Sequence, residues 1–361
     1  MPGFAFKAVV IGGGYATGRE LAEFFLPSGP RGGLYAMLLS MVIWSAVCAL
    51  TFLFAYQTNS LDYRTFFRNL LGRLWPAFEI AWILALVVIL AVYAAAAGAI
   101  GQSLFGWPTV SGSVFLVCAI TLVAVWGNEA VERLFKYVTF FLYGTYLMFV
   151  ILGFTQFGSR SIAAIAADTP TTGWVGGGLT YAGYNILGAV IILPVVRHFA
   201  SRRDAWIAGL LAGPMAMIPA FAFFFCMVAF YPQISAVALP SDYLLEQLHW
   251  PAFRIVFQLM IFAALLESST GGVHAINERV AHSLHGSGGT LSTRARLALT
   301  STVLAVAVFV ATRFGLVALI ASGFLWLSYA FLAIYVAPLV TLGLWRILRV
   351  SAAMPTFINR T

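Results

Sequence analysis

Acidic and hydroxyl side chains interrupt a long apolar run near residue 270. Glu267 directly precedes Ser268, Ser269 and Thr270. A charge at the bilayer centre costs about 2.5–3.5 kcal/mol even on the lenient insertion scale, so an intramembrane carboxyl is a candidate functional group. Carboxylate and hydroxyl oxygens are hard ligands that suit Na⁺, and a buried carboxyl is also a proton carrier. The pattern predicts a site for a cation or a proton. The alternative is a polar stripe satisfied by neighbouring helices.

Three consecutive glycines lie in the first apolar run. Gly12, Gly13 and Gly14 each lower helix propensity by roughly 1 kcal/mol relative to alanine. Backbone groups that are freed at membrane depth are tolerated only where they line a cavity or are buried in protein. We therefore expect these glycines, with Tyr15 and Thr17, to contribute to a binding site. Close helix packing through small residues is the alternative.

Charged residues follow the glycines directly. Arg19 and Glu23 are spaced i,i+4, so they can pair on the half-helix that resumes after the break, and Glu20 lies between them. Packing through small residues does not account for these three charges. We interpret Arg19, Glu20 and Glu23 as a gate, with contact to a substrate as a second interpretation.

A second glycine-rich apolar run lies about half a chain length further on. It contains Gly176–Gly178 and carries Tyr181, Tyr184 and Asn185 at its centre. Paired interrupted segments at matching positions of two halves are the best sequence indication of an inverted-repeat transporter site. The three polar residues are therefore predicted to contact a substrate. Tyr93, in an aliphatic run, is a further candidate hydroxyl donor, although a lone tyrosine there is ordinarily a packing residue.

The composition places these residues in a membrane protein. Hydrophobic residues make up 61% of the 361 residues and charged residues only 9%, against about 25% charged in soluble domains. The net charge of +8 is spread over short loops, so nucleic-acid binding is not indicated. Three cysteines without a CxxC spacing support neither a disulfide framework nor a metal site. Because no Walker A, HExxH or GxSxG pattern is present, we predict neither an enzyme nor a bound cofactor.

A helix needs about twenty mainly apolar residues to cross a bilayer. The chain therefore predicts an all-α membrane protein of about ten spanning helices, with helices 1 and 6 broken. The predicted spans are 4–27, 32–57, 76–102, 107–127, 133–157, 174–200, 204–231, 251–281, 294–312 and 314–346. They form two predicted halves, 1–157 and 174–346, with a cytoplasmic tail at 347–361. Short surface helices are expected in the loops 58–75 and 232–250.

The basic residues orient these spans. With the N-terminus in the cytoplasm, most of the twenty Lys and Arg residues fall in cytoplasmic loops, which agrees with the positive-inside rule. An even number of spans then returns the C-terminus to the cytoplasm. We expect a multi-pass protein of a bacterial-type inner membrane, and the lipid bilayer is its first predicted partner.

The glycine breaks in spans 1 and 6 and the hydroxyl residues of span 8 resemble the LeuT-fold transporters of the amino acid–polyamine–organocation superfamily. The stretch from Gly12 to Glu20 looks most like that of the YkvI-type amino acid permeases. The resemblance implies a five-plus-five inverted repeat and a substrate site between spans 1, 3, 6 and 8. It also implies alternating access by rocking of spans 1, 2, 6 and 7.

The resemblance further implies roles for individual residues. The break at Gly12–Thr17 would hold a substrate carboxylate, Tyr93 would touch that carboxylate, and Ser268 with Ser269 or Thr270 would complete a sodium site. Glu267 departs from the neutral sodium-coupled members, which favours a proton or both ions. The prediction is thus a secondary transporter of an amino acid or a related zwitterion or carboxylate, coupled to H⁺ or Na⁺. Alternatives are a transporter of a quaternary amine, nucleobase or metal, and a non-transporting sensor or subunit. The sequence leaves the oligomeric state open.

Overall fold

The computed structural model describes residues 16–126, 128–285 and 292–353, and these residues are helical almost throughout. The α-helices are α3 (Arg19–Phe24), α4 (Gly29–Thr58), α5 (Tyr63–Leu71), α6 (Trp75–Phe105), α7 (Thr109–Trp126), α8 (Asn128–Ala166), α9 (Trp174–Asn185), α10 (Leu187–Ile191), α11 (Arg202–Val228), α12 (Pro240–Gln247), α13 (Pro251–His285), α14 (Thr293–Ala318), α15 (Phe324–Phe331) and α16 (Leu344–Ala353). Short 3₁₀ segments are η1 (Leu26–Ser28), η2 (Gly72–Leu74), η3 (Leu193–His198) and η4 (Gln233–Ala236), and π-helical segments are η5 (Leu319–Gly323), η6 (Leu332–Val336) and η7 (Leu339–Gly343).

Local signals fix several helix ends. The Asp62 side chain accepts a hydrogen bond from the Thr65 amide at 2.9 Å and so caps α5. Ser201 and Asp204 form a reciprocal capping box at the start of α11. Gly106 ends α6 in the left-handed conformation, which glycine adopts without strain. These polar caps keep the helix ends in the short loops that the sequence predicts.

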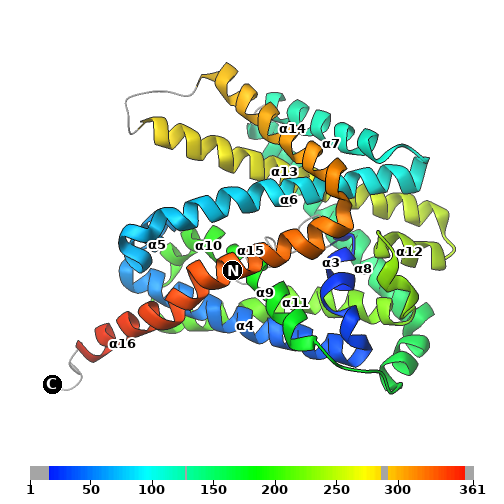
Figure 1. The fold of residues 1–361 in the computed structure, drawn as a ribbon, viewed down its shortest axis with the longest axis horizontal. Coiled ribbons are helices and arrows are strands. Elements are labelled where there is room, and N and C mark those ends of the chain that lie inside the picture. The colour runs from blue at the N-terminus through cyan, green and yellow to red at the C-terminus, as the bar shows by residue number, and fades with distance from the viewer. Residues whose placement is uncertain (1–15, 127, 286–291, 354–361) are drawn as a thin grey trace.

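The helices form two packed groups (Figure 1). In one group α6 packs against α7, α13 and α14, and in the other α4 packs against α9 and α11. Helix α8 contacts both α11 and α13, and α15 contacts both α9 and α6, so these two helices join the groups. Helices α5 and α16 lie at one end of the molecule and α12 lies at the opposite end.

Small residues allow the close approach of α4 and α11. A Cβ atom added at Gly209 would lie 2.2 Å from the Cα of Ala49, and one added at Gly213 would lie 2.2 Å from the carbonyl oxygen of Met41. No side chain larger than hydrogen fits at either position without moving the backbone. This is the small-residue packing that membrane helices use where lipid supplies no hydrophobic driving force.

Helical stretches that are long and apolar enough to cross a membrane account for most of the described residues. Six such stretches are found there: Arg19–Thr58, Tyr63–Phe105, Lys136–Ala166, Arg202–Val228, Pro251–Ala281 and Arg294–Arg349. The last contains the predicted spans 294–312 and 314–346, because only Gly315 (φ 75°) leaves helical geometry between them. The predicted span 174–200 is instead divided among α9, α10 and η3.

Several boundaries differ from the predictions. Helix α8 continues to Ala166, so most of the predicted loop 158–173 is helix, and α16 continues to Ala353 across the predicted start of the tail at 347. The glycines Gly176–Gly178 do not interrupt the sixth span, since α9 runs through them. A Cβ atom at Gly178 would lie 2.6 Å from the carbonyl oxygen of Ala36, so that glycine serves packing. The expected short helices are present as α5 and α12.

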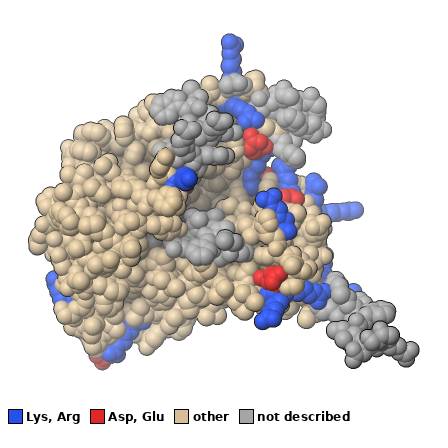
Figure 2. Space-filling view, turned by 180° about the vertical axis from the view of Figure 1, so that it is seen from behind, with Lys and Arg blue, Asp and Glu red and all other residues tan. Residues whose placement is uncertain are grey.

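Basic side chains gather at the end of the molecule that carries α5 and α16. Figure 2 shows most of the visible Lys and Arg side chains along this edge and a broad, largely uncharged surface over the rest of that face. Large apolar side chains are exposed on the outer helices, including Leu84, Phe140, Phe309 and Trp326. A charged end beside an apolar belt is the surface that a bilayer-spanning protein presents.

Candidate functional site

A cavity of about 650 Å³ lies between the two helix groups. Helices α3, α5, α6, α8, α9, α10, α13 and α15 all contribute to its wall. A volume of this size falls within the range of small-molecule sites. The residues predicted from the sequence that line it are Glu20, Tyr93, Tyr184, Asn185, Glu267 and Ser268.

Glu20 and Tyr184 lie at the end of the cavity that is away from the basic end of the molecule, and we call this the inner end. Gly18 has the left-handed conformation (φ 75°), and α3 begins directly after it, so Glu20 lies in the first helical turn. The positive end of a helix dipole favours a carboxylate at this position. The Tyr184 hydroxyl donates a hydrogen bond to Glu20 Oε2. The Tyr184 ring stacks on Phe324 with ring centroids 4.3 Å apart, which fixes the direction of its hydroxyl.

Tyr93, Ser268 and Glu267 form the facing wall. The side chains of Tyr93 on α6 and Ser268 on α13 are hydrogen-bonded to each other. Glu267 is half-buried, and its carboxylate has no hydrogen bond or ion pair within the part of the chain that the structure describes. Glu267, Ser268 and Gly271 all line the cavity because they share one face of α13.

The other hydroxyls of span 8 lie elsewhere. Ser269 and Thr270 are buried at 1% and 7% exposure and are not part of the cavity wall, and the Thr270 hydroxyl donates to the Leu266 carbonyl at 2.7 Å. Of the three neighbouring hydroxyl residues, Ser268 is therefore the one that faces the cavity. The structure places the carboxylate of Glu267 beside a single hydroxyl at the cavity surface.

Three more of the predicted site residues make contacts within the protein. Tyr181 is fully buried and packs against Phe25 and Trp44, with ring centroids 4.7 and 5.4 Å apart, away from the cavity wall. The Thr17 carbonyl accepts from the Ser241 amide at 3.0 Å, so Thr17 joins α3 to α12. Asn185 lines the cavity, but its amide donates to the Tyr181 carbonyl at 3.2 Å. Gly12, Gly13, Gly14 and Tyr15 lie outside the described residues.

The three charges predicted as a gate are divided between two places. Arg19 donates to Glu23 and to the backbone carbonyls of Ser235 (2.8 Å) and Val237 (2.9 Å), which closes α3 against the segment around η4. Glu20 points instead into the cavity. Neighbouring residues on a helix point about 100° apart, so one charge can serve the closure while the next faces the site.

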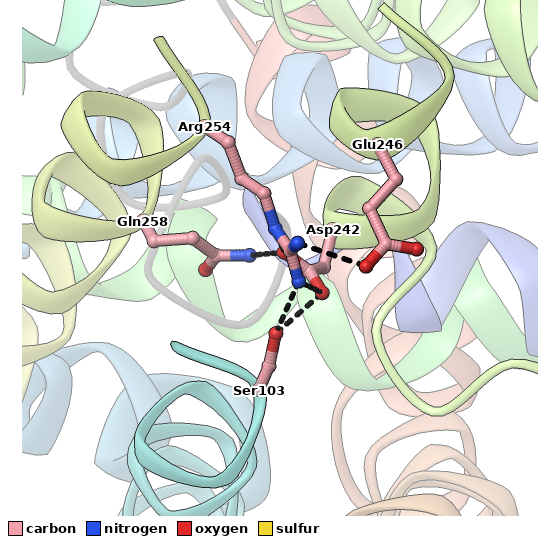
Figure 3. Close-up of polar contacts among 5 residues, drawn as sticks. All are labelled: Ser103, Asp242, Glu246, Arg254 and Gln258. Carbon is pink, nitrogen blue, oxygen red and sulfur yellow. Dashed lines mark hydrogen bonds and ion pairs between the residues drawn. The ribbon is translucent and has the colours of Figure 1, made fainter. Parts of the chain in front are cut away.

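A second polar cluster closes the same end of the molecule. Figure 3 shows Asp242 on α12 at its centre. The Asp242 carboxylate accepts two hydrogen bonds of 2.7 Å from Arg254, one of 2.8 Å from Gln258 and one from Ser103 on α6. Glu246 contacts the same guanidinium at 2.9 Å. We name this cluster the α12 lock. The sequence gives no indication of it, because Ser103 is far from the other four residues along the chain.

The other end of the cavity reaches the basic end of the molecule. Asp62, Tyr63, Trp82 and Arg279 line it there. The Arg279 guanidinium lies 4.1 Å from the Tyr63 ring centroid and 4.0 Å from that of Trp82, and 3.5 Å from a carboxylate oxygen of Glu79. Sequence reasoning did not single out this cluster, although a short surface helix was expected in the loop 58–75.

Metal ligands do not gather in the described residues. Within them no group of three or more His, Cys, Asp or Glu side chains lies close enough to hold a metal ion. Glu20 and Glu267 are the two carboxyl groups in the membrane part of the cavity wall, and their neighbours there are tyrosine and serine hydroxyls.

Known proteins share this architecture. No protein-family model matches the chain. The chain is 22% identical to the uncharacterized membrane protein YkvI of Bacillus subtilis (strain 168) over 282 residues, which cover 77% of this chain and 79% of YkvI. Its structure is similar to that of the Eremococcus coleocola manganese transporter in complex with an aromatic bis-isothiourea substituted compound. That likeness has a TM-score of 0.56 at 16% identity and covers 94% of this chain and 77% of the transporter. The chain shares the fold of this transporter.

These likenesses confirm the predicted resemblance to YkvI-type membrane proteins and to transporters of the LeuT-like fold. With the apolar helices, they establish a multi-pass membrane protein. The fold, however, does not name the solute, because one fold serves many functions.

Proposed function

We propose that the protein is a secondary active transporter that moves a small solute by alternating access, and that this solute is an amino acid or a related zwitterion or carboxylate. The observation that carries the proposal is the cavity itself. It lies between the helix groups of a transporter fold, and its inner end holds Glu20, Tyr184, Tyr93 and Ser268. Polar groups at membrane depth that converge on one cavity are typical of a substrate or ion site.

The repeat architecture supports this proposal. The predicted second and seventh spans, α4 and α11, pack along each other, and the sixth is divided at Ile186 between α9 and α10. In the first span, α3 begins directly after Gly18. Matching breaks in spans 1 and 6 suit a five-plus-five inverted repeat that is divided near residues 157 and 174, with a substrate at the breaks.

The distribution of charge suggests the state of the transporter. The cavity extends to the end of the molecule that carries most of the basic residues, which the positive-inside rule assigns to the cytoplasm. The opposite end is closed by Arg19 and by the α12 lock. We therefore infer an inward-facing state in the inner membrane, with both termini cytoplasmic.

Glu267 is the residue that we propose for coupling. Its carboxylate faces the cavity beside Ser268 and has no partner among the described side chains. A carboxylate in this setting binds a cation or carries a proton. Coupling to H⁺ or Na⁺ through Glu267 and Ser268 is thus the best supported mechanism, with the proton slightly favoured.

Uptake into proteoliposomes tests the proposal. The purified protein would be reconstituted and supplied with radiolabelled amino acids under an imposed H⁺ gradient or Na⁺ gradient, with nucleobases, a quaternary amine and Mn²⁺ as further arms. We expect concentrative uptake of at least one amino acid with one of the two gradients. Glu267→Gln should lose concentrative uptake but keep exchange, because the neutral amide resembles the protonated carboxyl.

Glu278→Gln is the matched control for this variant, since Glu278 is an exposed carboxyl on the same helix and outside the cavity wall. It should transport at the wild-type level. Absence of gradient-driven uptake for every solute would contradict the transport function. Unchanged accumulation by Glu267→Gln would contradict only its role in coupling.

A further inference from the structure

The inner end of the cavity holds a buried carboxylate that has no cationic partner among the described residues. Glu20 is 6% exposed, and its Oε2 atom accepts the hydrogen bond from Tyr184. Across the described ranges, no Lys, Arg or His side chain forms an ion pair with it. The neighbouring Arg19 directs its guanidinium away, toward Glu23 and toward the backbone carbonyl of Ser235.

Such a group is costly to bury unless something in the cavity compensates it. Removing an ion from water costs several kcal/mol even after the protein relaxes. The first turn of α3 and the Tyr184 hydroxyl offset part of this cost, and both favour the charged form of Glu20. The second carboxylate oxygen, Oε1, has no hydrogen bond to a described residue. It remains available to a donor that enters the cavity.

The walls around Glu20 suit an ammonium group. The Tyr184 and Phe324 rings stack beside the carboxylate, and both residues line the cavity. Tyr93 lies close enough to Glu20 for an electrostatic interaction. Aromatic faces attract cations through their quadrupole, and this attraction strengthens where water is excluded. A carboxylate with aromatic neighbours is therefore selective for a cationic group.

Charge also disfavours an anionic group at this end. Glu267 is a second carboxyl group in the same wall. Among the described residues, Arg279 is the single cation of the cavity lining, and it lies at the opposite end, against Tyr63, Trp82 and Glu79. A purely anionic solute would meet two carboxyl groups at the inner end and, among the described lining residues, no cationic side chain there.

We propose that Glu20 determines the specificity of the cavity by binding the protonated amine of the solute, and that Tyr184 positions its carboxylate. The inference rests on the proposed transport function and narrows its substrate class to solutes with a primary or secondary ammonium group. Such a group donates an N–H to Glu20 Oε1. Quaternary amines, which have no N–H, bind more weakly, and carboxylic acids without an amine are excluded.

Binding to matched solutes tests this inference directly. The full-length protein in lipid nanodiscs would be screened by thermal shift against the standard amino acids, each beside its N-acetyl derivative and its α-hydroxy acid, and affinities would follow from isothermal titration calorimetry. We expect binding of amine-bearing members alone. Glu20→Gln should weaken it by about 10- to 100-fold, which corresponds to one charge-assisted hydrogen bond.

Two further variants separate specificity from general damage to the site. Tyr184→Phe keeps the ring and removes the hydroxyl, so it should weaken binding by about 3- to 10-fold, the effect of a neutral hydrogen bond. Glu278→Gln changes an exposed carboxyl outside the cavity wall and should bind within about threefold of wild type, which corresponds to less than about 0.7 kcal/mol. If Glu20→Gln does not fold, Tyr184→Phe and Glu20→Asp carry the test.

The inference is overturned if hydroxy acids or N-acetyl derivatives bind as tightly as amino acids, if no panel member binds, or if Glu20→Gln keeps wild-type affinity. It is equally overturned if Glu20→Gln changes only the Na⁺ dependence of binding, because Glu20 would then be an ion site. Flux distinguishes this failure from failure of the proposed function. Transport of a solute without an amine would support the transport function and contradict the amine site. Binding of amines without any flux would support the amine site and contradict the transport function.

Discussion

The α12 lock should hold the cavity closed at the end opposite the basic residues. The perturbation is Asp242→Asn, which keeps the size of the side chain and removes the charge that Arg254 contacts through two hydrogen bonds of 2.7 Å. The side chains of Asp242 and Arg254 are 11% and 24% exposed. Breaking a fully buried pair costs about 3–5 kcal/mol and an exposed pair about 0.2–1 kcal/mol. This partly buried pair should therefore contribute about 2–3 kcal/mol.

The lock joins α6, α12 and α13 in the closed arrangement (Figure 3), and we expect opening to break it, so that energy should shift the conformational equilibrium. At about 1.4 kcal/mol per tenfold change, the open population should rise about 30- to 140-fold. The assay is labelling of a cysteine at Ala264, a buried residue of the cavity wall, by a membrane-impermeant thiol reagent. The background is Cys118→Ser, since Cys118 is exposed and the other two cysteines are buried.

Labelling would be measured in right-side-out cells and in inside-out vesicles. We expect Asp242→Asn to accelerate labelling from the α12 side, which is the extracellular side in the proposed orientation. Glu246→Gln is the control, because Glu246 contacts the same arginine but its side chain is 48% exposed, so it should change the rate less than about fivefold. The reasoning would be refuted if both variants were labelled at the rate of the parent, or if Glu246→Gln accelerated labelling as much as Asp242→Asn.

Three further predictions concern the wall, the packing and the basic end. Ser268→Ala should weaken the ion dependence of uptake while Ser269→Ala leaves it unchanged, because only the first lines the cavity; equal effects in ion titrations would contradict this. Gly209→Val should destabilise the protein by about 1–3 kcal/mol because the added side chain overpacks against α4, and the unfolding temperature should fall. Gly144→Val is the control and should leave that temperature unchanged, because the space around its Cβ position is open. Arg279→Lys should lower the unfolding temperature by a few degrees, since a lysine loses the planar stacking on two aromatic rings; an unchanged temperature would show that the charge alone suffices.

The outcome for the first and eighth spans shows where sequence reasoning succeeds and where it stops. The 100° spacing places Glu267, Gly271, His274 and Glu278 on one stripe of span 8 with Ser268 beside it. Glu267, Ser268 and Gly271 line the cavity, whereas His274 and Glu278 do not. The sequence left open whether Ser269 or Thr270 joins Ser268 at the site, and neither does. That outcome depends on which face of α13 the neighbouring helices cover, and covered hydroxyls such as Thr270 then bond to their own helix.

The sequence predicts those features of the protein whose physical cause lies in neighbouring residues. Membrane spans follow from the apolar content of about twenty neighbouring residues, and a short helix was expected in the polar loop that holds α5, where the structure shows a cap at Asp62. The polar residues Tyr93, Tyr184 and Glu267 were identifiable because they are exceptions inside apolar runs. All three line the cavity.

Pairings between distant segments were decided by the tertiary structure alone. The sequence predicts one charged group made of Arg19, Glu20 and Glu23. In the structure, Glu20 faces Tyr184 on α9, whereas Arg19 and Glu23 face the closed end near η4. The α12 lock likewise joins Ser103 to Asp242 across 139 positions of the chain. The sequence by itself determines which residues are too polar for lipid, because that cost belongs to each side chain. Which partner relieves the cost depends on helix packing, because the partner belongs to another helix.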